Sequence, residues 1–341
     1  MMKSVLVTGG AGFIGSHFIS YLLNKYNDIA LVNFDKLTYA ANLTYLTNHE
    51  SDSRYTFIEG DICNETQVND LFNQYQFDSV FHFAAESHVD NSIHTPEIFL
   101  DTNIKGTFYL LHAAKTLWMD SPFHVKPNFK EARFHHVSTD EVYGSLGSTG
   151  LFTETTSYAP NSPYSASKAS SDFMVRCYHH TYGINMTISN CSNNYGPHQH
   201  HEKLIPTIIR NAIHLKPIPI YGNGQNVRDW LFVTDHCDAI ATIFAKGQAG
   251  ETYNIGTRNE LTNLDLCHLI CSSLDSLHPR SDGLTYQDLI TFVADRPGHD
   301  QRYAIDPSKL EQDLGWQASS SFKADLETTI TYYLNHYVST S

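Results

Sequence analysis

The sequence has few cysteines and lacks the cysteine pairs that hold disulfide frameworks or metals. Its six cysteines stand at positions 63, 177, 191, 237, 267 and 271, and none belongs to a CxxC motif. Most lie in apolar segments, which predicts reduced packing residues in a cytoplasmic protein. His198, His200 and His201 crowd one segment, but no helix-spaced HxxxH or cysteine cluster completes a ligand set, so no metal is predicted.

Long apolar runs and basic stretches are also missing. The N-terminal segment MMKSVLVTGGAGFIG is broken by glycines and predicts neither a signal peptide nor a membrane span. The formal net charge is −14 with no run of Lys or Arg, which argues against nucleic acid as a partner. A small anionic ligand stays compatible with this charge, because a few local cations or backbone amides suffice to bind it.

Strand-like and helix-like patterns alternate along the chain. Short β-branched and aromatic runs at 4–9, 29–35, 55–61, 79–85, 133–139 and 186–192 predict strands, with helical patterns such as 14–26 and 103–118 between them. This alternation predicts an α/β fold, a Rossmann-like doubly wound parallel sheet with a smaller, irregular lobe. We expect the first domain at 1–192, rejoined by about 230–256, and the lobe at 193–229 and 257–341.

A glycine-rich turn follows the first expected strand and opens the first expected helix. Gly9, Gly12 and Gly15 fit GxxGxxG, a pattern that lets backbone amides approach a pyrophosphate. Asp35 ends the second strand, where a carboxylate binds ribose hydroxyls and repels a 2′-phosphate. The pattern therefore favours NAD over NADP, and a purely structural glycine turn is the alternative.

Two polar pairs follow this turn at positions where chemistry is expected. Tyr164 and Lys168 are four residues apart on one helix face, and an ammonium near a phenol favours the phenolate. Such a tyrosine can accept a proton from a sugar hydroxyl while hydride leaves the same carbon. Asp140 and Glu141 are adjacent at a strand end. This pattern has two interpretations: the two carboxylates are solvated turn residues, or they are a catalytic acid and base with different pKa values.

Several segments make the sequence similar to a known family. Besides the glycine turn and YxxxK, they are STDEVYG (138–144), AAESHVDNSI (84–93), NNYGP (193–197), EKLIP (202–206), RDWLFVTDH (228–236) and DRPGHDQRYAID (295–306). The chain resembles the nucleotide-sugar 4,6-dehydratases of the extended short-chain dehydrogenase/reductases over roughly residues 3 to 316. The resemblance implies an NAD-dependent hydro-lyase that converts dTDP-glucose to its 4-keto-6-deoxy product and water. UDP-glucose and CDP-glucose remain alternative substrates.

The resemblance also implies residue roles. Tyr164, supported by Lys168 and Thr139, would deprotonate the 4-hydroxyl, Glu141 would take the C5 proton, and protonated Asp140 would expel the 6-hydroxyl as water. The expected cofactor contacts are Gly9, Gly12, Phe13, Ile14, Gly15, Asp35, Lys36, Leu37, Thr38, Asp61, Ile62, Ala84, Ala85, Glu86, Ser87, His88, Thr102, Tyr164, Lys168 and Asn194. The expected substrate contacts are Ser87, Thr139, Asp140, Glu141, Asn193, Lys203, Leu204, Pro219, Ile220, Tyr221, Arg228, Asn263, Asp295, Arg296, Pro297, Gly298 and His299.

Two other functions compete with this interpretation. A nucleotide-sugar 4-epimerase would share the fold, NAD, Tyr164 and Lys168, but has no use for a C5 base and a C6 acid. A non-catalytic NAD-sensing scaffold would not need all four polar residues together. Arg228 and Arg296 suit the substrate diphosphate, with Asp229 as an expected ion-pair partner of Arg228. The resemblance further implies a homodimer through helices near 95–118 and 163–182, packed as a four-helix bundle.

Overall fold

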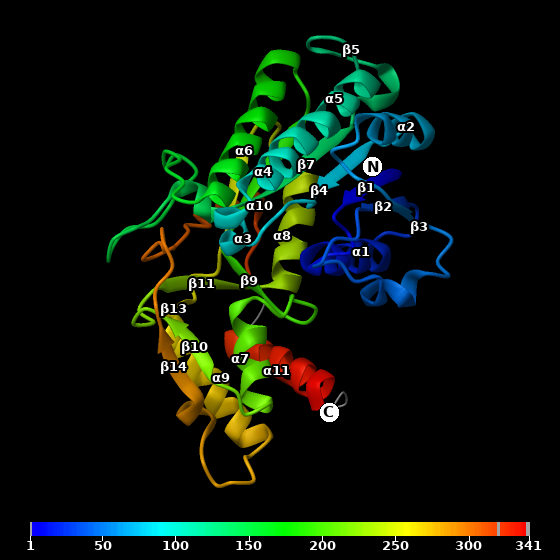
Figure 1. Cartoon of the computed structure of the whole chain (residues 1–341). Coiled ribbons are helices and arrows are strands. Elements are labelled where there is room, and N and C mark those ends of the chain that lie inside the picture. The colour runs from blue at the N-terminus through cyan, green and yellow to red at the C-terminus, as the bar shows by residue number, and fades with distance from the viewer. Residues whose placement is uncertain (1, 319–320, 339–341) are drawn as a thin grey trace.

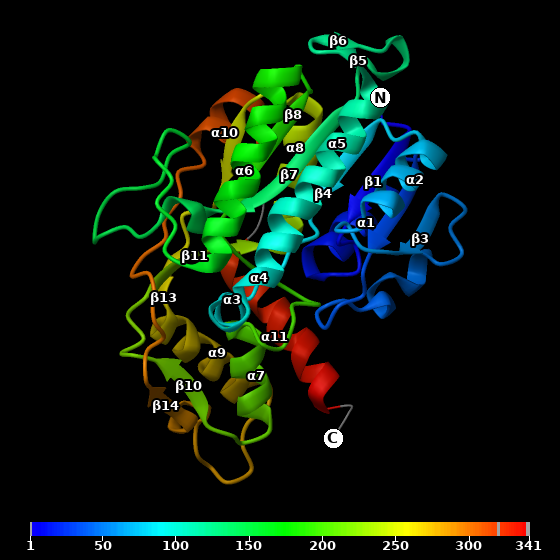
Figure 2. The ribbon, with the colours of Figure 1, turned by 45° about the horizontal axis from the view of Figure 1, so that its top comes forward.

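The central feature of the computed structural model, which describes residues 2–318 and 321–338, is a parallel sheet. Its seven strands lie in the order β12-β8-β7-β4-β1-β2-β3. They are β1 (Ser4–Thr8), β2 (Ala30–Asp35), β3 (Tyr55–Glu59), β4 (Ser79–His82), β7 (Arg133–Thr139), β8 (Met186–Cys191) and β12 (Thr252–Ile255). The chain proceeds from β1 to one edge and returns to β4 on the other side of β1 (Figure 2). A crevice is expected at the carboxyl ends beside this reversal. The doubly wound α/β prediction is confirmed.

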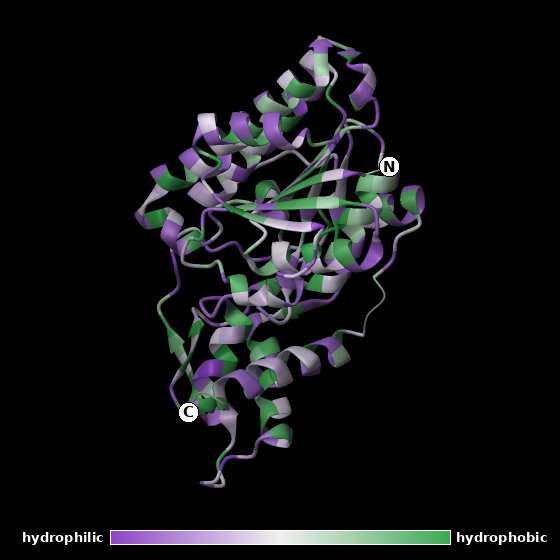
Figure 3. Ribbon diagram, turned by 90° about the vertical axis from the view of Figure 1, so that its right-hand side faces the viewer, coloured by the Kyte–Doolittle hydropathy of each residue, from purple (hydrophilic) through white to green (hydrophobic). Residues whose placement is uncertain are grey.

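Helices cover both faces of this sheet. The helices α1 (Phe13–Lys25), α8 (Val233–Lys246) and α10 (Ser308–Leu314) share one apolar cluster, and α2 (Glu65–Tyr75), α5 (Thr107–Trp118) and α6 (Pro163–Tyr182) share the other. Val5 and Val7 belong to the first cluster and Leu6 to the second, as the period of two in a strand requires. Figure 3 shows the apolar strands between the two helix layers.

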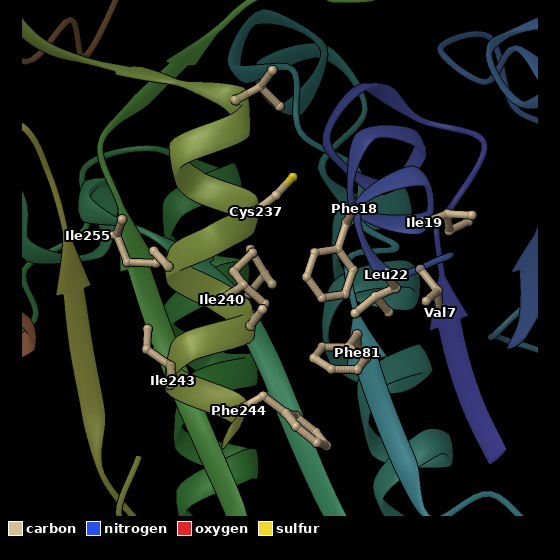
Figure 4. Close-up of a cluster of buried hydrophobic side chains, with 14 of the residues drawn as sticks. Val7, Phe18, Ile19, Leu22, Phe81, Cys237, Ile240, Ile243, Phe244 and Ile255 are labelled. Carbon is tan, nitrogen blue, oxygen red and sulfur yellow. The ribbon is translucent and has the colours of Figure 1, made fainter. Parts of the chain in front are cut away.

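The first cluster joins the start of the nucleotide half to a late helix. Phe18 of α1 packs on Phe81 of β4 at a ring distance of 4.6 Å, and Phe244 of α8 lies 4.3 Å from the same ring (Figure 4). The segment 230–256 therefore returns to the sheet, with α8 on its face and β12 as an edge strand. This contact fixes the end of α1 that carries the glycine turn.

Two segments are more structured than the sequence indicates. The polar segment 119–131, which shows no strand or helix pattern in the sequence, contains a small hairpin of β5 (Met119–Ser121) and β6 (His124–Val125), followed by a 3-10 turn at Pro127–Phe129. The helical region before it divides into α3 (Val89–His94), α4 (Pro96–Phe99), a π-helix (Leu100–Gly106) and α5. A 3-10 helix at Leu43–His49 also follows β2. The π-helix lies beside the crevice, a common place for such irregularities.

The second lobe lies at the opposite end from β5 and β6, beyond the carboxyl ends of the strands (Figure 1). It contains a sheet of β9 (Asn193–Tyr195), β11 (Val227–Phe232) and β13 (Glu260–Thr262), and a parallel pair of β10 (Ile218–Tyr221) and β14 (Ile290–Val293). Its helices are α7 (Leu204–Ile213), α9 (Asn263–Leu277) and α11 (Phe322–Val338), with a 3-10 turn at Tyr286–Leu289. These elements share an apolar core of their own.

The division of the chain into 1–192 with 230–256, and 193–229 with 257–341, stays a prediction. Within the second range, Leu310, Leu314 and Trp316 pack in the cluster of α1 and α8 rather than in the lobe core. Residues 1, 319–320 and 339–341 of the predicted ranges lie outside the described residues. None of the described helices is long and apolar enough to cross a membrane.

Candidate active site

The glycine turn between β1 and α1 is compact and leaves backbone exposed at the helix start. Gly9 has φ +72°, and a Cβ there would lie 2.6 Å from the backbone nitrogen of Ala84. A Cβ on Gly15 would clash with the carbonyl oxygen of Gly9. No side chain caps α1 at Gly12. The free amides at this helix N-terminus therefore suit a pyrophosphate.

Asp35 stands at the end of β2 beside this turn. Its Oδ2 accepts a hydrogen bond from the amide of Ala11 at 2.9 Å and its Oδ1 from the amide of Leu37 at 2.8 Å. Burial raises the pKa of Asp35, while the two backbone hydrogen bonds oppose the rise. Each carboxylate oxygen keeps a second lone pair, as binding to ribose hydroxyls requires. At the rim, Lys36 forms a 2.7 Å ion pair with Asp61.

The segment that follows β4 is held by a residue that the sequence did not single out. Asn103, in the π-helix, accepts from the amide of Glu86 at 2.9 Å and donates to its carbonyl at 3.0 Å. Its Nδ2 also donates to Ser167 Oγ on α6 at 2.8 Å. Because this one amide pins two elements, it fixes the backbone of the expected cofactor segment 84–88. His88 ends the segment, where its side chain caps α3.

The two adjacent carboxyls occupy different environments at the end of β7. They begin a 3-10 helix (Asp140–Tyr143) whose N-cap is Thr139. Asp140 is 2% exposed and its Oδ2 lacks a hydrogen-bond partner among the described residues. Burial, then the charges of Glu141 and Asp229, raise the pKa of Asp140 well above its ordinary value. The predicted protonated Asp140 is therefore supported, but burial outweighs the expected repulsion as its cause.

Glu141 lines the cleft, and three cations act on it. Burial raises the pKa of Glu141, while Arg228, Arg296 and Lys203 lower it. Asp140 has one such cation, Arg228, and two carboxylate neighbours that raise its pKa further. The surroundings therefore favour ionisation of Glu141 more than of Asp140, a difference that assigns a base and an acid.

Tyr164 and Lys168 lie one turn apart on α6, as the spacing predicts, but the expected effect on the phenol is wrong for the protein alone. Burial, Glu141 and Cys191 raise the pKa of Tyr164 well above its ordinary value, and a hydrogen bond with Thr139 lowers it. Lys168 donates to the carbonyl of Val137 at 2.8 Å, and its own pKa is lowered by burial. In the protein alone, desolvation and the nearby acidic groups thus outweigh the hydrogen bond that favours the phenolate.

The expected ion pair of Arg228 with Asp229 does not form. Arg228 donates to the carbonyls of Val227 and Asp300, at 2.8 and 3.0 Å, and its guanidinium lies 4.2 Å from the Tyr303 ring centroid. Successive residues of a strand point to opposite faces, so Asp229 faces the other way. Its carboxylate accepts from the amides of Thr257 and Asn259.

One cleft at the carboxyl ends of the strands brings most of the predicted residues together. Its lining includes Gly9, Gly12, Phe13, Ile14, Gly15, Asp35, Lys36, Thr38, Asp61, Ile62, Ala84, Ala85, Glu86, Ser87, Thr102, Thr139, Glu141, Tyr164, Lys168, Asn193, Asn194 and Lys203. It also includes residues that the sequence did not indicate: Phe34, Ala40, Ala41, Gly60, Phe83, Val137, Ser138, Cys191, Ser192, Gln199, His200 and Glu202. Glu202 is the first residue of the EKLIP segment, and its place next to Lys203 in that segment was the available signal for it.

The remaining predicted residues lie outside this lining. They are Leu37, His88, Asp140, Leu204, Pro219, Ile220, Tyr221, Arg228, Asn263, Asp295, Arg296, Pro297, Gly298 and His299. Most belong to the second lobe, beyond the catalytic carboxyls. The side chain of Ile220 packs in the lobe core, which leaves only its backbone for a ligand. Asn193 and Asn263 each carry a buried Oδ1 without a hydrogen-bond partner among the described residues, as a polar ligand contact would explain.

Comparisons with known proteins agree with this geometry. The family model described as GDP-mannose 4,6 dehydratase matches residues 6–329. A dTDP-glucose 4,6-dehydratase of Xanthomonas campestris pv. campestris (strain B100) is 51% identical over 335 residues, covering 98% of this chain and 94% of the relative. The crystal structure of DesIV, a dTDP-glucose 4,6-dehydratase from Streptomyces venezuelae with NAD and dTDP bound, matches with a TM-score of 0.87 and 43% identity over 98% of this chain and 97% of DesIV.

An enzyme with a different activity shares the fold at lower identity. UDP-glucuronic acid 4-epimerase from Bacillus cereus, solved with UDP-glucuronic acid and NAD, has a TM-score of 0.85 but 28% identity, over 98% of this chain and all of the epimerase. Overall shape therefore does not separate the two activities, whereas sequence identity does. The chain belongs to the GDP-mannose 4,6-dehydratase family of the extended short-chain dehydrogenase/reductases.

Proposed function

We propose that the chain converts dTDP-glucose to dTDP-4-keto-6-deoxyglucose and water with NAD as its resident cofactor. The observation that carries this proposal is the pair of carboxyls at the end of β7, one buried and one lining the cleft beside Tyr164. A 4-epimerase needs no such pair. Relatives named for this activity are about half identical over nearly the whole chain, which favours dTDP-glucose as the substrate.

NAD fits the residues at the glycine turn and at the end of β2. The unobstructed amides of α1 would hold the pyrophosphate, and Asp35 would hold the adenosine ribose and disfavour a 2′-phosphate. A bound NAD would supply the exchange of hydride with sugar C4 and C6. Its oxidised ring also carries positive charge, which would counter the desolvation that raises the pKa of Tyr164.

The residues of the chain divide the remaining proton transfers among them. Tyr164, ionised, accepts the proton of the 4-hydroxyl, and Thr139 donates a hydrogen bond to the same oxygen. The resulting ketone acidifies the C5 proton, which passes to Glu141. Asp140 donates its proton to the departing 6-hydroxyl, so that water leaves. Glu141 then returns its proton to C5 as C6 is reduced, and solvent restores Asp140 and Tyr164.

The second lobe would bind the nucleotide and the diphosphate. Arg228 and Arg296 offer guanidinium groups near the catalytic carboxyls, and both lower the pKa of Glu141. Because a diphosphate is anionic, its binding would draw these cations away from Glu141 and leave that carboxyl more basic. The ranges 193–229 and 257–341 are therefore proposed as the nucleotide-sugar lobe, with α10 packed on the cofactor domain.

A homodimer through the helices near 95–118 and 163–182, packed as a four-helix bundle, and a cytoplasmic location complete the proposal. Three exposed apolar side chains support the dimer face: Ile98 on α4, Leu100 on the π-helix and Phe173 on α6, which are 46%, 53% and 58% exposed. These elements contact one another on one side of the sheet (Figure 2). All six cysteines are free, as a reducing compartment would keep them.

Turnover of dTDP-glucose, UDP-glucose and CDP-glucose tests this function. The purified protein should convert dTDP-glucose fastest, and its product should show the near-ultraviolet absorbance in alkali that 4-keto-6-deoxy sugars share. Preference for another nucleotide would change the assigned base. An epimerised hexose without that absorbance would refute the dehydratase.

A further inference from the structure

Asp172 extends the catalytic face of α6 by one more turn. Tyr164, Lys168 and Asp172 follow one another at intervals of four residues, so they lie along one side of the helix. Both Lys168 and Asp172 are buried. A buried ammonium and a buried carboxylate one turn apart can compensate each other, and neither is stable there alone.

A histidine of β7 lies between these two charges. His136 Nε2 is 3.2 Å from Asp172 Oδ1, 3.4 Å from Lys168 Nζ and 3.1 Å from Ser171 Oγ. The other carboxylate oxygen of Asp172 accepts from Ser138 Oγ at 2.8 Å and from the Tyr158 hydroxyl at 3.0 Å. Asp172, itself on α6, thus contacts two other parts of the chain around the catalytic lysine: β7 and the segment before α6.

His136 is a neutral imidazole between these charges. Burial, with a smaller contribution from the Lys168 ammonium, lowers the pKa of His136 well below its ordinary value. Its Nε2 faces Asp172 Oδ1, Lys168 Nζ and Ser171 Oγ, whereas its Nδ1 has no hydrogen-bond partner among the described residues. The ring therefore links the carboxylate to the ammonium without adding a charge of its own.

Other titratable groups among the described residues also face Asp172 or Lys168. The titratable groups that face it or Lys168 are Arg176 on α6, His136 on β7, Cys191 on β8, Tyr143 and Tyr158. Farther back, His82 of β4 lies 5.2 Å from the His136 ring. Burial raises the pKa of Asp172 to about 6, against Lys168, Ser138 and Tyr158. Near neutral pH, Asp172 is thus an anion, and it raises the pKa of Lys168 against burial.

We propose that Asp172, linked through His136, is a positioning residue that keeps Lys168 protonated and so sets the pH range in which Tyr164 can accept the sugar proton. This inference rests on the proposed function of the same site. A lysine without its counter-charge would lose its proton more readily in this buried place. The phenolate of Tyr164 would then lose the positive charge that lies one helix turn away on the same face.

The test is the pH profile of kcat/KM for dTDP-glucose in Asp172→Asn, which keeps the shape of the side chain and removes its charge. The basic limb should move to lower pH because Lys168 deprotonates sooner, and the acid limb to higher pH because the Tyr164 phenolate is less favoured. Each limb should move by about one pH unit, and kcat at the optimum should fall about tenfold. KM should change by less than about twofold, since Asp172 does not line the cleft.

Asp238→Asn is the matched control. Asp238, on α8, accepts a hydrogen bond from Tyr21 at 2.5 Å far from the catalytic lysine, so the same isosteric change should leave both limbs in place. Limbs that stay at their wild-type pH in a folded Asp172→Asn protein would overturn the inference. If wild-type protein does not turn over dTDP-glucose, the proposed function fails instead, so the two failures are distinguishable.

Tyr158→Phe keeps the inference testable if Asp172→Asn does not fold. The change removes one hydrogen bond from the Asp172 anion but leaves its charge. The pKa of Asp172 should rise further, so the acid limb should move to higher pH while the basic limb stays. An acid limb that does not move in this variant would also overturn the inference.

Discussion

Asp140→Asn separates stability from catalysis at the acid of the proposed pair. Asp140 is buried, Oδ2 has no hydrogen-bond partner among the described residues, and burial with two neighbouring carboxyls raises its pKa well above the ordinary value. These surroundings therefore favour the neutral carboxylic acid form of the native side chain. Asparagine matches it in shape and charge but cannot release a proton.

The stability of the folded protein should increase in this variant. Unfolded Asp140 ionises above its ordinary pKa while the folded carboxyl stays protonated, so folding must take up a proton. A raised folded pKa gives full stability only below the unfolded pKa, and that stability is lost as pH rises toward the folded pKa. Each pH unit of this rise costs about 1.4 kcal/mol, a cost that asparagine does not carry. The urea midpoint of the variant should therefore exceed that of the wild type at neutral pH, and match it near pH 3.

Catalysis should fall sharply in the same protein. Loss of a positioned general acid costs about 10² to 10⁴ in rate, which corresponds to about 3 to 5 kcal/mol of barrier. The loss should appear in elimination and not in oxidation at C4. Single-turnover absorbance should show the reduced cofactor forming and persisting, while the alkali absorbance of the product develops slowly. Turnover within about tenfold of wild type would refute the acid role, and loss of cofactor reduction would show that Asp140 acts earlier.

Three further changes test other parts of the structure. Gly15→Ala should lower the thermal midpoint far more than Gly12→Ala. A Cβ at position 15 clashes with the backbone of the turn, whereas the atom nearest to a Cβ at position 12 is 3.3 Å away. Equal thermal midpoints for the two variants would contradict this packing. Burial lowers the pKa values of His135 and His136, so on acidification the unfolded chain takes up protons that the folded protein does not. The free energy of unfolding should therefore fall below about pH 6.5, by up to about 1.4 kcal/mol per pH unit for each histidine. A urea midpoint that stays constant between about pH 7 and pH 5 would exclude this contribution. Phe173→Glu should convert the proposed dimer to monomer in light scattering, and an unchanged mass would move the interface elsewhere.

Local patterns sufficed for the parts of the site that depend on neighbouring residues. The glycine turn, the YxxxK spacing and the strand that ends at Thr139 each rest on a period or a turn that a single segment contains. The parallel sheet followed from the alternation of such segments, and its order was confirmed as doubly wound. What these patterns specify is where the backbone of the cleft lies.

Contacts between distant segments could not be predicted in this way. Asn103 holds Glu86 because a π-helix turns its amide toward a strand end 17 residues away in sequence. Arg228 lies on Tyr303 because a lobe strand meets the returning chain, and no local pattern encodes that register. The prediction of an ion pair between Arg228 and Asp229 was wrong for a related reason. The two residues are adjacent in the sequence, but successive side chains of a strand point to opposite faces and therefore do not meet.

The carboxyl pair at 140 and 141 shows why burial must be known before a pair of acids can be interpreted. The sequence gives two equal neighbours, and repulsion between equal neighbours cannot decide which one holds the proton. The 3-10 turn after β7 removes that equality, because it places Asp140 in the interior near Asp229 and leaves Glu141 at the cleft near three cations. Desolvation and two neighbouring carboxyls then favour the protonated form of Asp140 against Arg228, and three cations favour ionisation of Glu141 against its burial. The division into acid and base is therefore a property of the turn and of the second lobe together.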